Sequence, residues 1–256
     1  KFIGNMVTNW ADNSQNEKYL KLDARVEETY AKNSNAVLSK SAYDSYIKAF
    51  RWASDRLDPA LGGVIAFISN AGWIDASGLD GFRKCLEKEF SSIYVFNLRG
   101  DQRTSGELSR KEGGKIFGAG SRTPIAITLL IKNPAQNVAK ARIHYHDIGD
   151  YLSRDEKLKA IKNFSNILNP TMPLMELHPN SHGDWINQRN DSFGSYIPLQ
   201  EETRFSSNTK SFFSIHSLGI ATNRDTWLWN SSRNKLGNQV EKMIAYYNDQ
   251  SISYTK

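Results

Sequence analysis

The sequence has 256 residues and a mass of 29.0 kDa, which is enough for one large domain or two modest ones around a substantial core. A hydrophobic content of 39% with 11% aromatic residues argues against disorder, and the lack of a long apolar run argues against a membrane span. Thirty-three Lys and Arg against 27 Asp and Glu give a net charge of +6, which suits a polyanionic partner without requiring one. Because no leader precedes Lys1 and Cys85 is the single cysteine, we expect a cytoplasmic protein.

The first forty residues are mostly polar. Residues 1–4 read as the end of a buried strand, which places Asn5 at the tip of that strand. Residues 8–40 look like a long loop with a short helix over 22–32. A loop of that length inside a compact protein is usually functional or disordered.

The next hundred residues alternate between helix and strand patterns. Residues 41–57 carry a helical apolar stripe, and Ser41 with Asp44 resembles a capping box. The unbroken apolar run 62–69 is typical of a strand buried on both faces of a parallel sheet. A helix and two strands follow at 78–90, 92–98 and 123–131. This order predicts an α/β sheet with right-handed crossovers, whose ligands lie at the carboxyl ends of the strands, near Asn5, Asn70, Asn97 and Arg99.

The pattern changes near residue 136, where we place a domain boundary. Residues 143–148 predict one more strand and 153–164 a helix. The remainder is irregular, polar and aromatic up to a last helix over 236–248. We therefore expect a partial Rossmann-like α/β domain over 1–136 and an irregular α+β region over 137–256.

Residues 99–122 form a loop with six Gly and six Arg or Lys against three acidic residues. Gly118 and Gly120 precede a strand, whereas nucleotide-binding glycines follow one, so we favour a mobile loop over a nucleotide site. The composition suggests contacts with DNA phosphates rather than with bases. The expected contact residues are Arg99, Arg103, Arg110, Lys111, Lys115 and Arg122.

Signs of metal binding or covalent catalysis are weak. His144, His146 and Asp147 have a spacing that metals can use, but no other His or Cys cluster completes a ligand shell. No Gly-x-Ser-x-Gly turn occurs, and Cys85 lies on a predicted helix that faces away from any obvious histidine. The sequence therefore favours ordinary structural histidines, with no metal and no covalent intermediate.

Two polar segments, 182–191 and 219–230, repeat one chemistry in which Asn, Arg and Asp lie beside Trp. Arg and Asn make paired hydrogen bonds to guanine and adenine edges, and an aromatic ring can stack on an unpaired base. The alternative is structural, with the Trp rings in the core and Arg–Asp pairs pinning turns. The residues alone favour neither role for the candidates Trp185, Arg189, Asn223 and Arg224.

The stretch from YDSYIKAFRWASDRL through GGVIAFISNAGWID to TPIAITLLIKNP resembles the second half of the adenine-N6 DNA methyltransferase core of single-polypeptide (type ISP) restriction-modification enzymes. Downstream, HYHDIGDYLSRDEKL, NSHGDWINQR and GIATNRDTWLWN resemble the segment that follows this core, where target recognition is expected. The resemblance covers nearly the whole chain. It implies methyl transfer to adenine N6 in duplex DNA, with S-adenosylmethionine as donor and the target base flipped out.

In such enzymes a strand like FIGN runs into Asn-Pro-Pro-Tyr or Phe, whose Asn and first Pro carbonyl accept hydrogen bonds from the adenine amino group. Asn5 occupies the Asn position, but Met6, Val7 and Thr8 follow it. The glycine loop that holds S-adenosylmethionine in this family has no counterpart here. The resemblance therefore implies half of a methyltransferase, inactive alone, that needs its N-terminal half or a partner supplying it.

The expected function is thus part of a site-specific adenine-N6 methyltransferase that acts on double-stranded DNA. A non-catalytic DNA-recognition or assembly module is the alternative from another class. A third and less favoured interpretation is an unrelated α/β binding protein.

Overall fold

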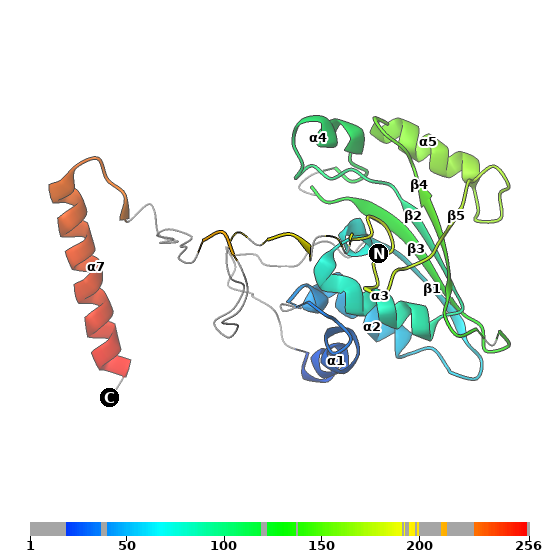
Figure 1. Cartoon of the computed structure of the whole chain (residues 1–256), viewed down its shortest axis with the longest axis horizontal. Coiled ribbons are helices and arrows are strands. Elements are labelled where there is room, and N and C mark those ends of the chain that lie inside the picture. The colour runs from blue at the N-terminus through cyan, green and yellow to red at the C-terminus, as the bar shows by residue number, and fades with distance from the viewer. Residues whose placement is uncertain are drawn as a thin grey trace. The chain divides into compact units, whose positions relative to one another are not determined.

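The computed structural model describes residues 19–36, 40–118, 122–136, 138–190, 192, 195–197, 199, 211–213 and 228–254. Residues 1–4, predicted as a strand end, and Asn5 lie outside these ranges. The chain divides into two compact units, Lys1–Arg189 and Asn190–Lys256. The second unit contains helix α7 (Arg233–Tyr254), so the predicted last helix is confirmed and is longer than expected (Figure 1).

A five-stranded mixed sheet forms the centre of the first unit. Its strands are ordered β1-β3-β2-β4-β5. Strand β3 runs antiparallel between β1 and β2, β4 runs parallel to β2, and β5 runs antiparallel to β4. The carboxyl ends of β1, β2 and β4 therefore lie at the same edge. The strand bounds are β1 (Gly63–Asn70), β2 (Ser92–Asn97), β3 (Ile125–Lys132), β4 (Arg142–Asp147) and β5 (Met175–Leu177).

The predicted α/β class is confirmed, but β1 is not the buried parallel strand that its apolar run predicted. Its only partner among the described strands is β3, which is antiparallel to it. Ile65 is buried, whereas Val64 is 62% exposed and Ile68 is 42% exposed. An apolar run in the sequence cannot reveal whether a second layer covers the outer face of a strand.

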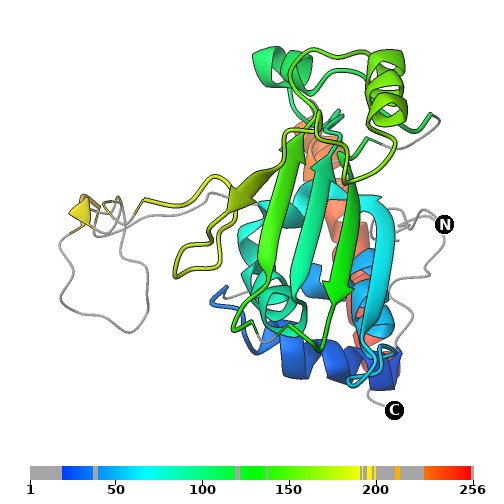
Figure 2. The ribbon, with the colours of Figure 1, turned by 90° about the vertical axis from the view of Figure 1, so that its right-hand side faces the viewer.

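Three helices cover the other face of the sheet. They are α1 (Leu20–Val26, continued by a π-helical turn over Glu27–Ala31), α2 (Ser45–Ser54) and α3 (Asp80–Glu89), and they lie behind the sheet in Figure 2. Phe50 on α2 packs against Trp73 and Phe82, with ring centroids 6.0 and 5.3 Å away. These large buried rings provide much of the apolar surface removed from water on folding.

The predicted capping box of Ser41 and Asp44 is wrong. Residues Lys40–Tyr43 form a separate 3-10 turn, and α2 begins after Asp44, whose side chain makes no capping hydrogen bond. Ser41 instead donates to the Gly78 carbonyl at 3.4 Å. The hydroxyl is therefore used to attach the turn to a neighbouring segment.

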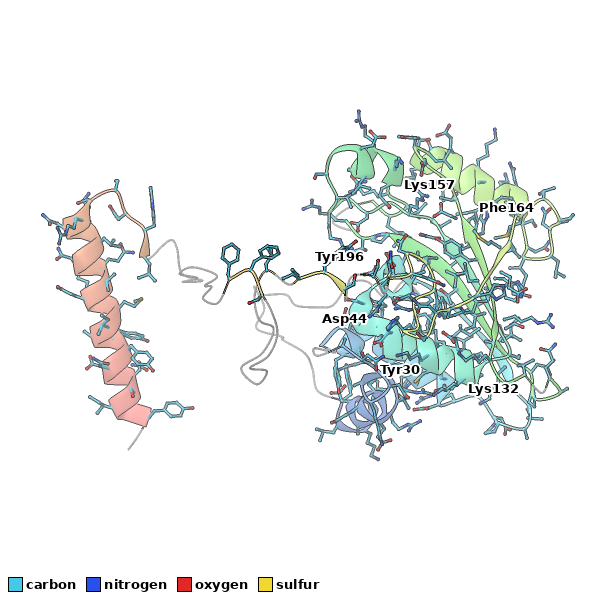
Figure 3. All side chains as sticks on the ribbon, viewed as in Figure 1. Tyr30, Asp44, Lys132, Lys157, Phe164 and Tyr196 are labelled. Atoms are coloured by element: carbon cyan, nitrogen blue, oxygen red, sulfur yellow. The ribbon has the colours of Figure 1, made fainter. Side chains whose placement is uncertain are left out.

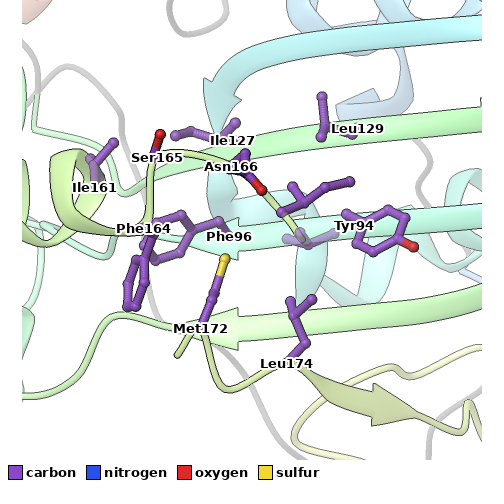
Figure 4. A pocket seen from close by; sticks show the side chains of 12 residues that line it. Tyr94, Phe96, Ile127, Leu129, Ile161, Phe164, Ser165, Asn166, Met172 and Leu174 are labelled. Atoms are coloured by element: carbon purple, nitrogen blue, oxygen red, sulfur yellow. The ribbon is translucent and has the colours of Figure 1, made fainter. Parts of the chain in front are cut away.

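The opposite face of the sheet is only partly covered. Helix α5 (Arg154–Phe164) begins at a complete capping box formed by Ser153 and Glu156 and packs over one end of this face. Beside it, an apolar pocket of about 140 Å³ lies between the sheet, α5 and the loop that follows α5 (Figure 4). Tyr94, Ile127 and Leu129 line this pocket from the sheet. We call this side, including Val64 and Ile68, the open face.

The compact unit continues well beyond the predicted boundary near residue 136. Strand β4 pairs with β2 from Ser92 opposite Arg142 to Asn97 opposite Asp147, so it belongs to the same sheet. The chain leaves this unit only after Arg189. The change in composition near residue 136 therefore lies within the first unit, because β4, which follows it, pairs with the edge of β2 that β3 does not occupy.

Candidate functional site

A polar cleft of about 580 Å³ lies at the edge where β1, β2 and β4 end. Asn97 and Arg99 line it, as expected, whereas Asn70 is buried and its side chain accepts a hydrogen bond from the Gly72 amide. The walls come from the turn after β1, the ends of β2 and β4, and a segment near residue 187. The lining residues are Ala71, Gly72, Ile74, Asp75, Ala76, Asn97, Arg99, Asp101, Glu112, Pro124, Tyr145, Asp147, Ile186 and Asn187.

Arg99 organises the polar side chains at the ends of β2 and β4. Its Nε donates to Asp147 at 2.7 Å, and its Nη1 donates to Asp150. These carboxylates raise the pKa of Arg99 against the opposing effect of burial. Its φ of +55° is uncommon for a residue other than glycine. The guanidinium therefore holds two carboxylates beside the cleft, and DNA phosphates would have to compete with them.

A second series of hydrogen bonds joins the ends of β2 and β4. Asn97 donates from Nδ2 to the Tyr145 hydroxyl at 3.0 Å, and that hydroxyl donates to Asp147 at 3.2 Å. Burial raises the pKa of Tyr145 to about 12, so the hydroxyl stays protonated and can donate. The cleft floor thus has a fixed pattern of donors and acceptors.

The basic loop contains helix α4 (Gly106–Glu112), which sequence patterns did not predict. Arg103 pairs with Asp101, and Arg110 pairs with Glu107 at 2.6 Å. Their side chains are 52% and 73% exposed, and that of Lys111 is 44% exposed. Such exposed pairs are worth little, so these cations can exchange their partners for phosphates. Arg122 bonds the Gln102 carbonyl, and Lys115 is half-buried.

The loop is anchored to the start of α5 by close backbone packing. A Cβ at Gly113 would lie 2.2 Å from the Leu152 carbonyl oxygen, so only glycine fits there, and its φ is +66°. Lys157 points from α5 toward this turn (Figure 3) and donates to the carbonyls of Glu112 and Gly114 at 2.7 and 2.8 Å. The side chain is fully buried, and burial lowers the pKa of Lys157 to about 8.

The contacts around Trp185 are those expected if this segment has a structural role, with the Trp ring in the core and an Arg–Asp pair in a turn. Trp185 is 2% exposed, packs its ring 5.4 Å from that of Trp73 and donates to Glu87 at 2.8 Å. The Arg189 guanidinium donates two hydrogen bonds to Asp184, at 2.7 and 2.8 Å. Those bonds lower the pKa of Asp184 well below its usual range. Asn223 and Arg224, the other candidate base readers, lie outside the described residues.

Two functional residues of this region, Arg83 and Asn187, were missed by sequence reasoning. Arg83 is fully buried on α3 and donates to the Gly183 carbonyl at 2.7 Å. Asn187 donates to Asp75 at 2.8 Å across one side of the cleft. The available signal was the position of Arg83, four residues after Leu79 and therefore on the apolar face of α3.

The two strand histidines have packing partners. His144 stacks on Tyr94 with ring centroids 4.5 Å apart, and His146 lies 3.0 Å from the Pro173 carbonyl. Within the part of the chain that the structure describes, no three His, Cys, Asp or Glu side chains are grouped to hold a metal ion. In the same residues, no helix has the length and apolar character needed to cross a membrane.

Comparison with known proteins gives a consistent result. The chain aligns over 96% of its length with 44% identity and a TM-score of 0.81 to a nuclease-deletion mutant of the type ISP restriction-modification enzyme LlaGI, solved with a DNA substrate mimic. The chain is thus similar to a segment of type ISP restriction-modification enzymes. The family model of the type ISP C-terminal specificity domain matches residues 211–256.

Other type ISP and DNA-bound structures are also similar. The ATP-dependent type ISP enzyme LlaBIII bound to DNA shares 38% identity over 91% of this chain, with a TM-score of 0.79. A DrdV–DNA complex shares 28% identity over 97%, with a TM-score of 0.81. The chain spans only 19%, 15% and 24% of the lengths of these three relatives. A search of curated proteins found no match.

Proposed function

We propose that this chain is part of an enzyme that transfers a methyl group from S-adenosylmethionine to adenine N6 in a specific duplex DNA sequence. The main support is the 44% identity, over 96% of the chain, with an enzyme solved with a DNA substrate mimic. The cleft adds to it, because ligands of α/β sheets bind at the carboxyl ends of strands. Its volume of about 580 Å³ lies in the range of small-molecule sites.

In this proposal the target adenine leaves the duplex and enters the cleft, where the fixed donors and acceptors of Asn97, Arg99 and Tyr145 face it. Asn5 accepts a hydrogen bond from the adenine amino group, which draws the nitrogen lone pair out of conjugation with the ring. Exposed cations of the α4 loop contact phosphates. We also propose the cytoplasm as the compartment, where the buried free thiol of Cys85 stays reduced.

Base reading is proposed for Asn223 and Arg224. Both lie within the segment that matches the specificity domain, and their side chains suit paired bonds to adenine and guanine. Trp185 and Arg189 were candidates for the same role. Their contacts instead support a part in holding the segment next to the cleft.

The methyl donor must be tested against the residues present. The family resemblance implies that a glycine loop holds the donor, and none of the described segments forms a glycine loop that follows a strand and opens a helix. The described residues therefore do not fit the donor, and we derive no step through it. We propose that an N-terminal half, in the same polypeptide or a partner, holds the donor and covers the open face at Val64 and Ile68.

The alternative, a non-catalytic recognition module, is supported by the specificity-domain match alone. Two measurements separate the functions. Calorimetry on the isolated chain should show no binding of S-adenosylmethionine, and micromolar binding would contradict the half-enzyme proposal. The full-length polypeptide should produce N6-methyladenine at one DNA sequence, detected by mass spectrometry. Specific DNA binding without any methylation would establish the module instead.

A further inference from the structure

Asn187 closes one side of the cleft from a segment that follows the sheet in the sequence. Its Nδ2 donates to Asp75 Oδ2 at 2.8 Å, and both residues line the cleft. Asp75 ends the 3-10 turn Ala71–Ile74, which directly follows β1. The φ of Asn187 is +46°, a left-handed conformation that carries some strain outside glycine and persists where the surroundings impose it.

Arg83 joins the same two segments a second time, beneath the cleft. Its Nε donates to the Gly183 carbonyl at 2.7 Å, while its Nη1 donates to the carbonyls of Trp73 and Ala76 at 2.9 and 2.8 Å. The guanidinium is fully buried, so removal of the Gly183 segment would leave one of its buried N–H groups and the Gly183 carbonyl without partners. The turn after β1 and the segment beside Asn187 are therefore both attached to the same buried side chain.

This segment is also the covalent route from the cleft to the second unit. Arg189, two residues after Asn187, is the last residue of the first unit. Its guanidinium bonds Asp184 at 2.7 and 2.8 Å, which fixes the exit of the chain against the segment that Arg83 holds. The match to the specificity domain begins at residue 211.

We propose that Asn187 is a positioning residue that holds one wall of the cleft in place. Its bridge to Asp75 holds the turn after β1 and the segment around Asn187 together, in the conformation of the cleft wall that accepts the flipped base. This inference rests on the proposed methyl transfer. Loss of the bridge should slow base entry while DNA affinity stays constant, because the proposed phosphate and base contacts lie elsewhere in the chain.

The test exchanges the donor and the acceptor of the Asn187–Asp75 hydrogen bond in the full-length enzyme. Asn187→Asp places a second carboxylate against Asp75, and the double change Asp75→Asn with Asn187→Asp restores one donor facing one acceptor. We expect Asn187→Asp to lower kcat for methylation, and the fluorescence of 2-aminopurine at the target position, by about ten-fold, with Kd for the cognate duplex within about two-fold. The double variant should recover both signals.

Two further variants separate positioning from folding. Asn187→Gly keeps the left-handed backbone without strain and removes the bridge, so it should lower kcat by about five-fold at an unchanged melting temperature. Gln188→Ala removes the neighbouring bond to the His178 carbonyl, away from the cleft, and should keep wild-type kcat.

Each outcome has a separate meaning. A wild-type enzyme that does not methylate adenine refutes the proposed function. A methylating enzyme with unchanged kcat in Asn187→Asp and Asn187→Gly refutes the positioning role of Asn187. Loss of activity that follows the melting temperature and is not recovered in the double variant shows a merely structural bridge and also overturns the inference.

Discussion

Replacing Trp185 by Phe separates base reading from structural support. The indole donates to Glu87 at 2.8 Å, and Glu87 is itself only 3% exposed. Phe retains an aromatic face toward Trp73 but leaves a buried carboxylate with one donor fewer, which costs about 1–3 kcal/mol. The smaller ring adds about 1 kcal/mol for lost packing. Because 1 kcal/mol shifts Tm by roughly 2–4 °C in a unit of this size, we expect Tm to fall by about 4–16 °C.

The assay is thermal unfolding of the chain, followed by circular dichroism. Trp229→Phe is the matched control, because Trp229 belongs to the second Trp-containing segment and is 76% exposed. Its replacement should change stability by less than about 0.5 kcal/mol. A Trp185→Phe chain with unchanged Tm, in an enzyme that has lost preference for its cognate site, would refute the structural role and restore base reading.

Replacing Arg103, Arg110 and Lys111 together by Ala should weaken binding to all DNA sequences alike and lower the slope of log affinity against log salt concentration by about one per lost contact. Anisotropy titrations over a series of salt concentrations would detect this. An unchanged slope would show that the loop does not contact phosphates. Lys157→Met should remove the part of the pH dependence of folding stability that Lys157 causes. Because the folded pKa of Lys157 is about 8 against 10.5 for the free side chain, the unfolded chain binds more protons between these values, and wild-type stability should rise relative to the variant by about 2–3 kcal/mol from pH 8 to 10.5 in urea titrations. Arg224→Ala in the intact enzyme should reduce the binding free-energy difference between cognate and random DNA by roughly 1–3 kcal/mol at constant Tm. A fall in Tm with an unchanged difference would show that Arg224 stabilises a turn instead.

Local patterns predicted the elements that local forces determine. The apolar run 62–69 and the helical pattern over 78–90 identified β1 and α3, because period and length are visible in one segment. The insertion of β3 between β1 and β2 was not predicted, since strand pairing is decided by contacts distant in sequence. Helix α4 and strand β5 are short, and a few residues give no measurable period.

In the candidate site, too, some features could be predicted from the sequence and others could not. The edge carrying Asn97 and Arg99 could be predicted, because strand ends in an α/β sheet collect at one side. The burial of Trp185 could not, since a polar neighbourhood in sequence says nothing about a partner such as Glu87, 98 residues away. Asn187 escaped notice for a related reason: an asparagine in a polar loop becomes informative only when its φ and its bond to Asp75 are known.

The open face of the sheet has a consequence for handling the protein in solution. Among the described strands, β1 lies at an edge of the sheet and exposes Val64 and Ile68, and an exposed apolar edge strand is a template for pairing with another molecule. When the chain is purified alone, this surface should bind hydrophobic dyes and promote concentration-dependent self-association. The charge of +6 opposes such association at low ionic strength, so the colloidal stability of the isolated chain should fall as salt screens that charge.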